Sequence, residues 1–298
     1  MKAQSDNLEI HIDDMGGSGE PLLLIMGIGA QLVLWPDEFC VRLRDRGFRV
    51  IRFDNRDVGQ STYLSNAAAP DPRKTLARAA LRRPIDAPYT LSHMARDARA
   101  VLDALKIDKA HIVGMSMGGM IAQTFCLEHE ARALTLTSIS STPGCRRYAL
   151  MAKPAAIRAL LGPPPLTRDE AGARCTATFV AIGGKTHPTD VALLTQMGRT
   201  SFDRGSNPAG FARHLAAICA SGSRRKHLPQ LKLPTLVIHG SQDPLIPAPA
   251  GRATAALIPN SRLLELGDMG HDLPRPLWNV MADAISRLAE DARDARLK

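Results

Sequence analysis

The sequence has few aromatic residues, few cysteines and no long apolar run. Aromatic side chains make up 4% of its 298 residues, whereas a single-stranded nucleic-acid interface usually interleaves them with basic ones. The five cysteines form no C-x-x-C pair and are odd in number, which favours a reducing compartment over a disulfide framework. The longest apolar stretch, residues 21–35, is interrupted by polar and glycine residues and is too short to span a bilayer.

Several further motifs are missing. Residues 1–9 are polar and lack the apolar core of a signal peptide, so we expect a cytoplasmic protein without a membrane partner. The nine histidines are dispersed, with neither H-E-x-x-H nor zinc-type Cys/His spacing. No G-x-G-x-x-G or Walker loop is present. The sequence therefore predicts neither a metal nor a cofactor.

The net charge of +9 is spread along the chain. Its tightest basic clusters are only residues 82–83, 146–147 and 224–226, and no aromatic residue lies among them. A nucleic-acid binder concentrates its charge in a stripe or tail. We therefore predict a solvated basic surface that steers anionic ligands weakly, and no nucleic-acid partner.

Short apolar runs alternate with helical patterns along most of the chain. The expected strands are residues 8–12, 22–26, 49–53, 110–113, 134–139, 235–239 and 262–266. The expected helices are residues 37–46, 91–105, 117–130 and 277–289. This alternation predicts an α/β protein with a mostly parallel, doubly wound sheet.

The alternation breaks between residues 142 and 224. This stretch is rich in proline and shows helical patterns at residues 155–161 and 211–220, with no convincing strand. We interpret residues 143–222 as a helical cap inserted into a core of residues 1–142 and 223–298. An ordinary pair of crossover helices is the alternative, but about 80 residues exceed what one crossover needs.

A serine flanked by glycines stands at the most informative turn. Residues 114–119 read G-M-S-M-G-G and lie between an expected strand and an expected helix. Glycines two residues before and after Ser116 remove side chains that would collide across such a tight turn. The pattern predicts that Ser116 is a nucleophile held above the sheet edge.

A serine hydroxyl needs a base, and the base needs an orienting acid. Asp243 directly follows one expected strand, and His271 follows the next. Both should therefore lie at the sheet edge where Ser116 emerges. Asp268 and Asp272 are alternative acids, but neighbours on the same loop rarely reach a histidine ring. No acid follows residues 134–139.

With these motifs in place, nearly the whole chain resembles the α/β-hydrolase superfamily. Residues 22–39, 50–57 and 247–251 are similar to aclacinomycin methylesterase and its bacterial esterase relatives. The resemblance implies Ser116 as nucleophile, His271 as base and Asp243 as acid. It also implies an oxyanion hole formed by the backbone N–H groups of Met117 and Ile28. The loop of residues 27–29 is the one glycine loop after the 22–26 strand, which independently favours Ile28.

Two residues depart from the patterns common in this superfamily. Met26 stands before Gly27 where many hydrolases carry histidine, which argues against lipases and carbon–carbon hydrolases. Asp57 occupies a position that is often glycine, and the sequence assigns it no role.

The expected substrate pocket is apolar. Five of the eleven methionines fall beside the elements named above: Met26, Met115, Met117, Met120 and Met269. We expect Met26, Met115 and Met269, with Gly27 and Trp35, to line an adaptable pocket. Packing alone would also account for the methionines, and Trp35 would equally suit the start of the following helix.

The sequence thus predicts a serine carboxylester hydrolase that forms an acyl-enzyme on small to medium, largely apolar esters, with methyl esters as one candidate. Two alternatives stay open: a cofactor-free perhydrolase or haloperoxidase with the same triad, and a ligand-binding hydrolase fold with little turnover. The expected partner is a small-molecule ester. The chain could be a monomer or a homodimer.

Overall fold

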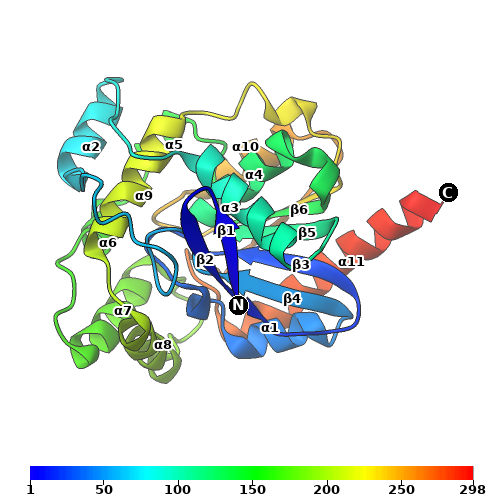
Figure 1. Cartoon of the computed structure of the whole chain (residues 1–298), viewed down its shortest axis with the longest axis horizontal. Coiled ribbons are helices and arrows are strands. Elements are labelled where there is room, and N and C mark those ends of the chain that lie inside the picture. The colour runs from blue at the N-terminus through cyan, green and yellow to red at the C-terminus, as the bar shows by residue number, and fades with distance from the viewer. Residues whose placement is uncertain (298) are drawn as a thin grey trace.

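The computed structural model describes residues 1–297 and contains one eight-stranded sheet (Figure 1). The strands are β1 (Lys2–Ser5), β2 (Leu8–Asp14), β3 (Glu20–Ile25), β4 (Phe48–Phe53), β5 (Ala110–Met115), β6 (Ala133–Ile139), β7 (Thr235–Gly240) and β8 (Ser261–Leu266). Their order in the sheet is β1-β2-β4-β3-β5-β6-β7-β8. Only the β1–β2 and β2–β4 pairs are antiparallel, as a mostly parallel sheet predicts.

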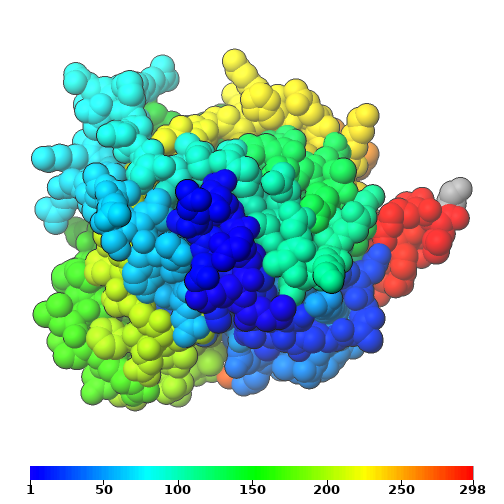
Figure 2. Space-filling model, viewed as in Figure 1, coloured from blue at the N-terminus to red at the C-terminus, as the bar shows by residue number. Residues whose placement is uncertain are grey.

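The part of the chain that the structure describes also forms α-helices, some of which cover the two faces of the sheet. They are α1 (Asp37–Arg44), α2 (Pro72–Ala80), α3 (Leu91–Ala104), α4 (Met117–Glu128), α5 (Arg146–Ala149), α6 (Pro154–Leu160), α7 (Arg168–Ile182), α8 (Val191–Arg204), α9 (Pro208–Ser221), α10 (Ala248–Leu257) and α11 (Trp278–Leu297). Helices α3, α4 and α10 pack on one face, and α1 and α11 pack on the other. Figure 2 shows the β1–β2 hairpin crossing the visible surface and the end of α11 projecting beyond the body.

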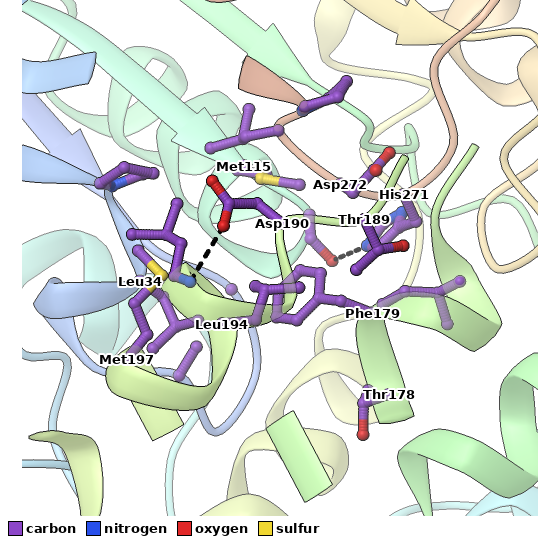
Figure 3. A pocket seen from close by; sticks show the side chains of 18 of the residues that line it. Leu34, Met115, Thr178, Phe179, Thr189, Asp190, Leu194, Met197, His271 and Asp272 are labelled. Carbon is purple, nitrogen blue, oxygen red and sulfur yellow. Dashed lines mark hydrogen bonds between the residues drawn. The ribbon is translucent and has the colours of Figure 1, made fainter. Parts of the chain in front are cut away.

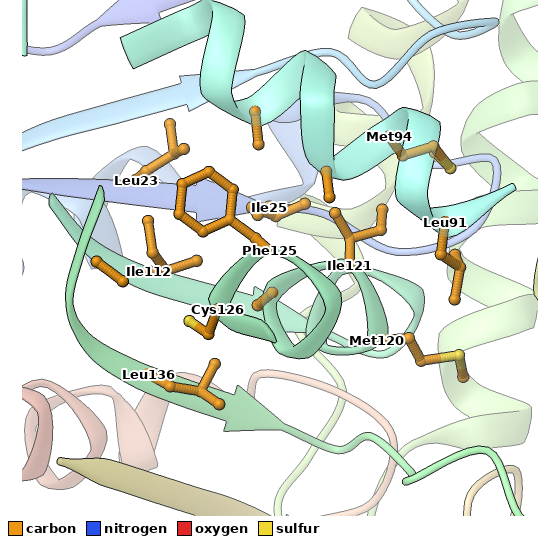
Figure 4. Packing of buried hydrophobic residues seen from close by; sticks show 14 of the residues in the cluster. Leu23, Ile25, Leu91, Met94, Ile112, Met120, Ile121, Phe125, Cys126 and Leu136 are labelled. Atoms are coloured by element: carbon orange, nitrogen blue, oxygen red, sulfur yellow. The ribbon is translucent and has the colours of Figure 1, made fainter. Parts of the chain in front are cut away.

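Buried aliphatic side chains join the sheet to α3 and α4. Leu23 and Ile25 of β3 and Ile112 of β5 meet Ile121 and Phe125 of α4, and all five are fully buried (Figure 4). Burying each such side chain stabilises the fold by about 1.5–3 kcal/mol. This packing holds the start of α4, and with it the turn after β5, firmly against the sheet.

The predicted strands all form, and each of their bounds lies within two residues of the predicted one. The structure adds β1 and the helices α2, α5, α7, α8 and α10, which the sequence patterns did not predict. The four residues of β1 are largely polar, and they form a strand by pairing with β2. Helix α2 is fixed locally, because the Asp71 carboxylate accepts hydrogen bonds from the backbone N–H groups of Arg73 and Lys74.

Between β6 and β7 the chain forms helices α5 to α9. Helix α7 packs along α8 and also contacts α6, whereas α9 packs against α2 and α3 (Figure 1). The segment therefore contains one group of helices over the sheet edge and one helix set against the core. Within residues 1–297, no helix is both long and apolar enough to cross a membrane.

Candidate active site

Ser116 occupies a strained turn between β5 and α4. Its φ of 58° and ψ of −120° lie where non-glycine residues are rare. The turn is so tight that a Cβ at Gly114 would lie 2.1 Å from the carbonyl oxygen of Gly118. A Cβ at Gly118 would lie 1.9 Å from the carbonyl oxygen of Ile25 in β3. Both glycines are therefore required by close backbone contacts, and the Ser116 hydroxyl projects from the carboxyl edge of the sheet.

Three side chains from separate loops meet at this edge. The Ser116 Oγ lies 2.9 Å from His271 Nε2, and His271 Nδ1 lies 2.7 Å from the Asp243 carboxylate. With Nδ1–H donating to Asp243, Nε2 is left to accept the Ser116 hydroxyl proton. All three residues are buried, with exposed fractions of 8% or less. The structure thus brings together the three residues that the sequence order selected.

Backbone groups hold the acid and the base in place. One oxygen of Asp243 accepts hydrogen bonds from the N–H groups of Leu245 and Ile246, at 2.9 and 2.8 Å, and the other faces His271. The backbone N–H of His271 donates to the carbonyl of Ile182, the last residue of α7, at 2.7 Å. The candidate base is therefore positioned by the cap as well as by the sheet.

The two alternative acids serve other partners. The Asp268 carboxylate lies 2.7 Å from His187 Nε2. Asp272 accepts hydrogen bonds from the backbone N–H groups of Gly184 and Gly270, and burial raises the pKa of its carboxyl group. Neither acid forms a hydrogen bond with the His271 ring. The position after β6 also lacks an acid, and there Ser141 Oγ donates to the Ser116 carbonyl.

Two backbone N–H groups near Ser116, those of Met117 and Ile28, have no acceptor among residues 1–297. Met117 is the first residue of α4, so its N–H has no acceptor within the helix. The Ile28 N–H finds no acceptor within residues 1–297. The neighbouring Gly27 lies against Ser116, since a Cβ there would be 3.3 Å from Ser116 Cβ. These are the two N–H groups that the sequence resemblance implies as oxyanion donors.

A cavity of about 190 Å³ opens beside Ser116 and His271. Met26, Gly27 and Met115 line it, as predicted. The cap supplies the opposite wall, with Phe179 from α7 and Leu194 and Met197 from α8. Figure 3 shows these cap side chains across the cavity from Met115.

Two expected pocket residues lie elsewhere. Trp35 is fully buried and its ring stacks on Phe39 with centroids 6.0 Å apart, so packing at the start of α1 is its actual environment. Met269 is also fully buried, in the cluster beneath β7 and β8. The tryptophan that lines the cavity is Trp278, at the start of α11.

The sequence patterns did not predict the residues of α7 and α8 that line the cavity. Helix α7, which carries Phe179, lacks a clear apolar stripe. Helix α8 has apolar residues at positions 193, 194 and 197, but its sequence does not say what this side of the helix packs against. One signal in the sequence was a glycine within each helix, Gly172 in α7 and Gly198 in α8. A Cβ at Gly198 of α8 would lie 2.4 Å from the carbonyl oxygen of Ala171, which shows how tightly α7 and α8 pack.

Comparison with known proteins shows the family of the chain. The sequence profile of the alpha/beta hydrolase fold matches residues 20–274. The chain is 31% identical to the rhodomycin D methylesterase DauP of Streptomyces sp. (strain C5), over 89% of each chain. It is 28% identical to a protein of Mycobacterium tuberculosis (strain CDC 1551 / Oshkosh) provisionally named non-heme bromoperoxidase BpoC, over 87% of this chain and 89% of that one.

Solved structures show the same fold. The enol-lactonase from Burkholderia xenovorans LB400 matches with a TM-score of 0.69 and 24% identity, over 99% of this chain and 100% of that one. The chain belongs to the α/β-hydrolase family. It is an enzyme of the hydrolase class, and esterases are among its relatives.

Proposed function

We propose that the protein is a serine carboxylester hydrolase that works through an acyl-enzyme. The observation that carries this proposal is the pair of hydrogen-bond distances at His271, 2.9 Å to Ser116 Oγ and 2.7 Å to Asp243. A serine, a histidine and a carboxylate in this relation form the arrangement that activates a serine hydroxyl.

Acylation and deacylation then follow from the positions of these atoms. Ser116 Oγ attacks the ester carbonyl carbon while His271 Nε2 takes the hydroxyl proton, and Asp243 stabilises the imidazolium that forms. The bond to the leaving alcohol breaks as His271 gives it this proton, which leaves an ester on Ser116. Water then attacks this ester, with His271 again taking and returning a proton, and releases the carboxylic acid.

The two free N–H groups supply the electrostatic part of the mechanism. As the carbonyl becomes tetrahedral, its oxygen gains negative charge, and we assign the Ile28 and Met117 N–H groups as the donors that stabilise it. The start of α4 adds the positive end of the helix dipole. One such donor typically contributes about 10²–10³-fold in rate.

The cavity supports an apolar ester of modest size as the substrate. Its volume is about 190 Å³, and most of its lining is aliphatic, aromatic or methionine. Among its charged members, Asp190 and Arg275 pair with each other, and Asp272 accepts hydrogen bonds from the backbone N–H groups of Gly184 and Gly270. A short alkyl or methyl ester suits this space, and the similarity to a rhodomycin D methylesterase supports a methyl ester among the candidates.

The test is hydrolysis of p-nitrophenyl acetate and butyrate by the native chain and by Ser116→Ala. The variant should lose kcat by roughly 10⁴-fold or more, because the nucleophile is absent while the fold is kept. Ser92→Ala, on the exposed side of α3, is the matched control and should retain native rates. Native-like turnover by Ser116→Ala would overturn the proposal.

Peroxide as the acyl acceptor is the second candidate, which the similarity to BpoC favours. It needs the same acyl-enzyme, with hydrogen peroxide in place of water in the second half-reaction. Measuring peracid against free acid at increasing peroxide concentrations separates the two. A product that stays almost entirely carboxylic acid supports the esterase, and a dominant peracid product supports the perhydrolase.

A further inference from the structure

We infer that His214 of α9 is a positioning residue that holds the loop of residues 27–30 so that the Ile28 N–H faces the reacting carbonyl. The inference rests on the proposed ester hydrolysis, in which that N–H is an oxyanion donor. His214 lies 185 residues from Gly29 of this loop in the sequence. Its ring forms no hydrogen bond with the side chain of Ser116, Asp243 or His271.

The two ring nitrogens of His214 have backbone partners of opposite kind. Nδ1 accepts a hydrogen bond from the Gly29 N–H at 3.1 Å, and Nε2 lies 2.8 Å from the Arg56 carbonyl oxygen. An N–H can only donate and a carbonyl can only accept, so Nδ1 is unprotonated and Nε2 carries the proton. The ring therefore bridges the loop after β3 and the loop after β4 in one fixed tautomer.

The surroundings of His214 keep the ring neutral. The side chain is fully buried, and burial lowers its pKa to about 4. Tyr89 packs edge-on against it, with ring centroids 6.2 Å apart. Protonation would place an N–H on Nδ1 directly opposite the Gly29 N–H, so the bond to the loop exists only in the neutral form.

The neighbouring residue fixes the helix that carries His214. Arg213 donates two hydrogen bonds to the buried Asp57 carboxylate, at 2.8 and 2.6 Å, and Tyr89 donates a third at 2.7 Å. Asp57 is held at a φ of 70°, directly after the carbonyl of Arg56 that accepts from His214. Asp57, to which the sequence assigned no role, therefore has a structural one. Its ion pair with Arg213 holds α9 in the position from which His214 reaches Gly29.

The loop itself needs such an external attachment. Its only internal turn bond is a long one, from the Ala30 N–H to the Gly27 carbonyl at 3.3 Å. Gly29 adopts a φ of 64°, and a Cβ there would meet the Phe211 ring of α9 at 2.7 Å. The bond from Gly29 to His214 fixes the peptide plane next to the one that bears the Ile28 N–H. Without it, the Ile28 N–H would sample other directions before each reaction.

Two substitutions of His214 each keep one of its two hydrogen bonds, to Gly29 or to Arg56, and remove the other. In His214→Asn, the side-chain oxygen takes the place of Nδ1 and can still accept from Gly29, while the donor to Arg56 is lost. In His214→Gln, the terminal NH₂ takes the place of Nε2 and can still donate to Arg56, while the acceptor for Gly29 is lost. Each variant buries one amide and removes one bond, so they are matched controls for each other.

The experiment measures kcat and KM on p-nitrophenyl butyrate for the native chain and both variants. Since the bond to Gly29 acts on the transition state, His214→Gln should lose about 30–100-fold in kcat at nearly constant KM, and His214→Asn less than about fivefold. Inhibition by a trifluoromethyl ketone, whose adduct with Ser116 places an oxyanion in the same hole, should weaken in parallel with kcat. A purely structural role would lower stability in both variants without this selective effect.

The possible outcomes are distinct. Equal losses in the two variants, or native kcat in His214→Gln, would overturn the positioning role while an active native chain keeps the proposed function. An inactive native chain would instead contradict the proposed function. If His214→Gln does not fold, amide hydrogen exchange in the native chain tests whether the Gly29 N–H is held in its bond to His214. Gly29 should exchange far more slowly than the open-loop Gly267, and equal rates would overturn the inference.

Discussion

The backbone N–H of His271 donates a hydrogen bond to the carbonyl of Ile182, the last residue of α7. The candidate base is thereby attached to the cap, close to where the glycines of the two segments touch. A Cβ at Gly270 would lie 2.2 Å from the backbone of both Gly183 and Gly184. Helix α7 therefore helps to position His271, in addition to lining the cavity.

This contact predicts that a single methyl group at Gly270 impairs catalysis. In Gly270→Ala the new Cβ must push the 183–184 backbone away, which moves the Ile182 carbonyl and with it His271. We expect kcat to fall by about tenfold or more, since small displacements of catalytic groups are costly. Gly267→Ala is the control on the same loop, because a Cβ there meets nothing within 4 Å. Equal activity of the two variants would contradict the role of this contact.

The acid position gives a second prediction. In Asp243→Asn the carboxylate is replaced by an amide, whose NH₂ cannot accept from His271 Nδ1–H and favours the wrong tautomer. We expect kcat/KM for p-nitrophenyl butyrate to fall by roughly 10³–10⁴-fold. Asp268→Asn, which alters the acid paired with His187, should stay within about fivefold of native. A larger loss in Asp268→Asn than in Asp243→Asn would exchange the two assignments.

The cap wall should set the acyl-length preference. Phe179→Ala removes a ring that lines the cavity opposite Met115, so longer acyl chains gain room. The ratio of kcat/KM for hexanoate to that for acetate should rise by about tenfold, in line with what a few methylene groups contribute in an apolar pocket. Val180→Ala is the matched control, because Val180 is 57% exposed and points away from the site. An unchanged ratio in Phe179→Ala would show that acyl groups bind elsewhere.

The buried ring of His214 predicts a pH dependence of stability. Its pKa falls from 6.5 to about 4 on folding, so between these values the unfolded chain binds a proton that the folded chain does not. Stability contributed by this group is therefore complete above pH 6.5 and decreases as the pH falls, by about 3 kcal/mol near pH 4.

Urea unfolding of the native chain and of His214→Asn at pH 7, 5.5 and 4.5 measures this effect. The difference in unfolding free energy between the two proteins should shrink steadily toward low pH, because the asparagine does not titrate. His227 is exposed, so His227→Asn gives the change in unfolding free energy expected from replacing a solvent-exposed histidine. A native minus His214→Asn difference that is constant with pH would contradict the neutral, buried ring.

The sequence predicted the sheet, and the meeting of the loops that carry Ser116, Asp243 and His271, because the signals for both are local. The strands that flank Ser116, Asp243 and His271 are apolar runs, and the glycines around Ser116 are demanded by a turn of a few residues. Where three parallel strands end at one edge, their loops must meet. The order of the three residues along the chain was therefore enough to bring them together.

The cap and its contacts could not be predicted in this way. Which face of α7 or α8 points at the cavity depends on how the helices pack together, so Phe179 and Leu194 were missed while Trp35 was wrongly placed in the pocket. Asp57 and His214 are far apart in the sequence. Only the folded chain shows that Asp57 holds α9 through Arg213 and that His214 of α9 bonds to the loops of Gly29 and Arg56.

Labelling with a fluorophosphonate, followed by peptide mass spectrometry, tests the central claim most directly. The reagent phosphonylates a serine only where a base and an oxyanion hole activate it, so it reports the assembled site without any choice of ester. The account predicts a single adduct on the native chain, located on Ser116, and no adduct on the urea-unfolded chain. An unlabelled native chain, or an adduct on a different serine, would contradict it.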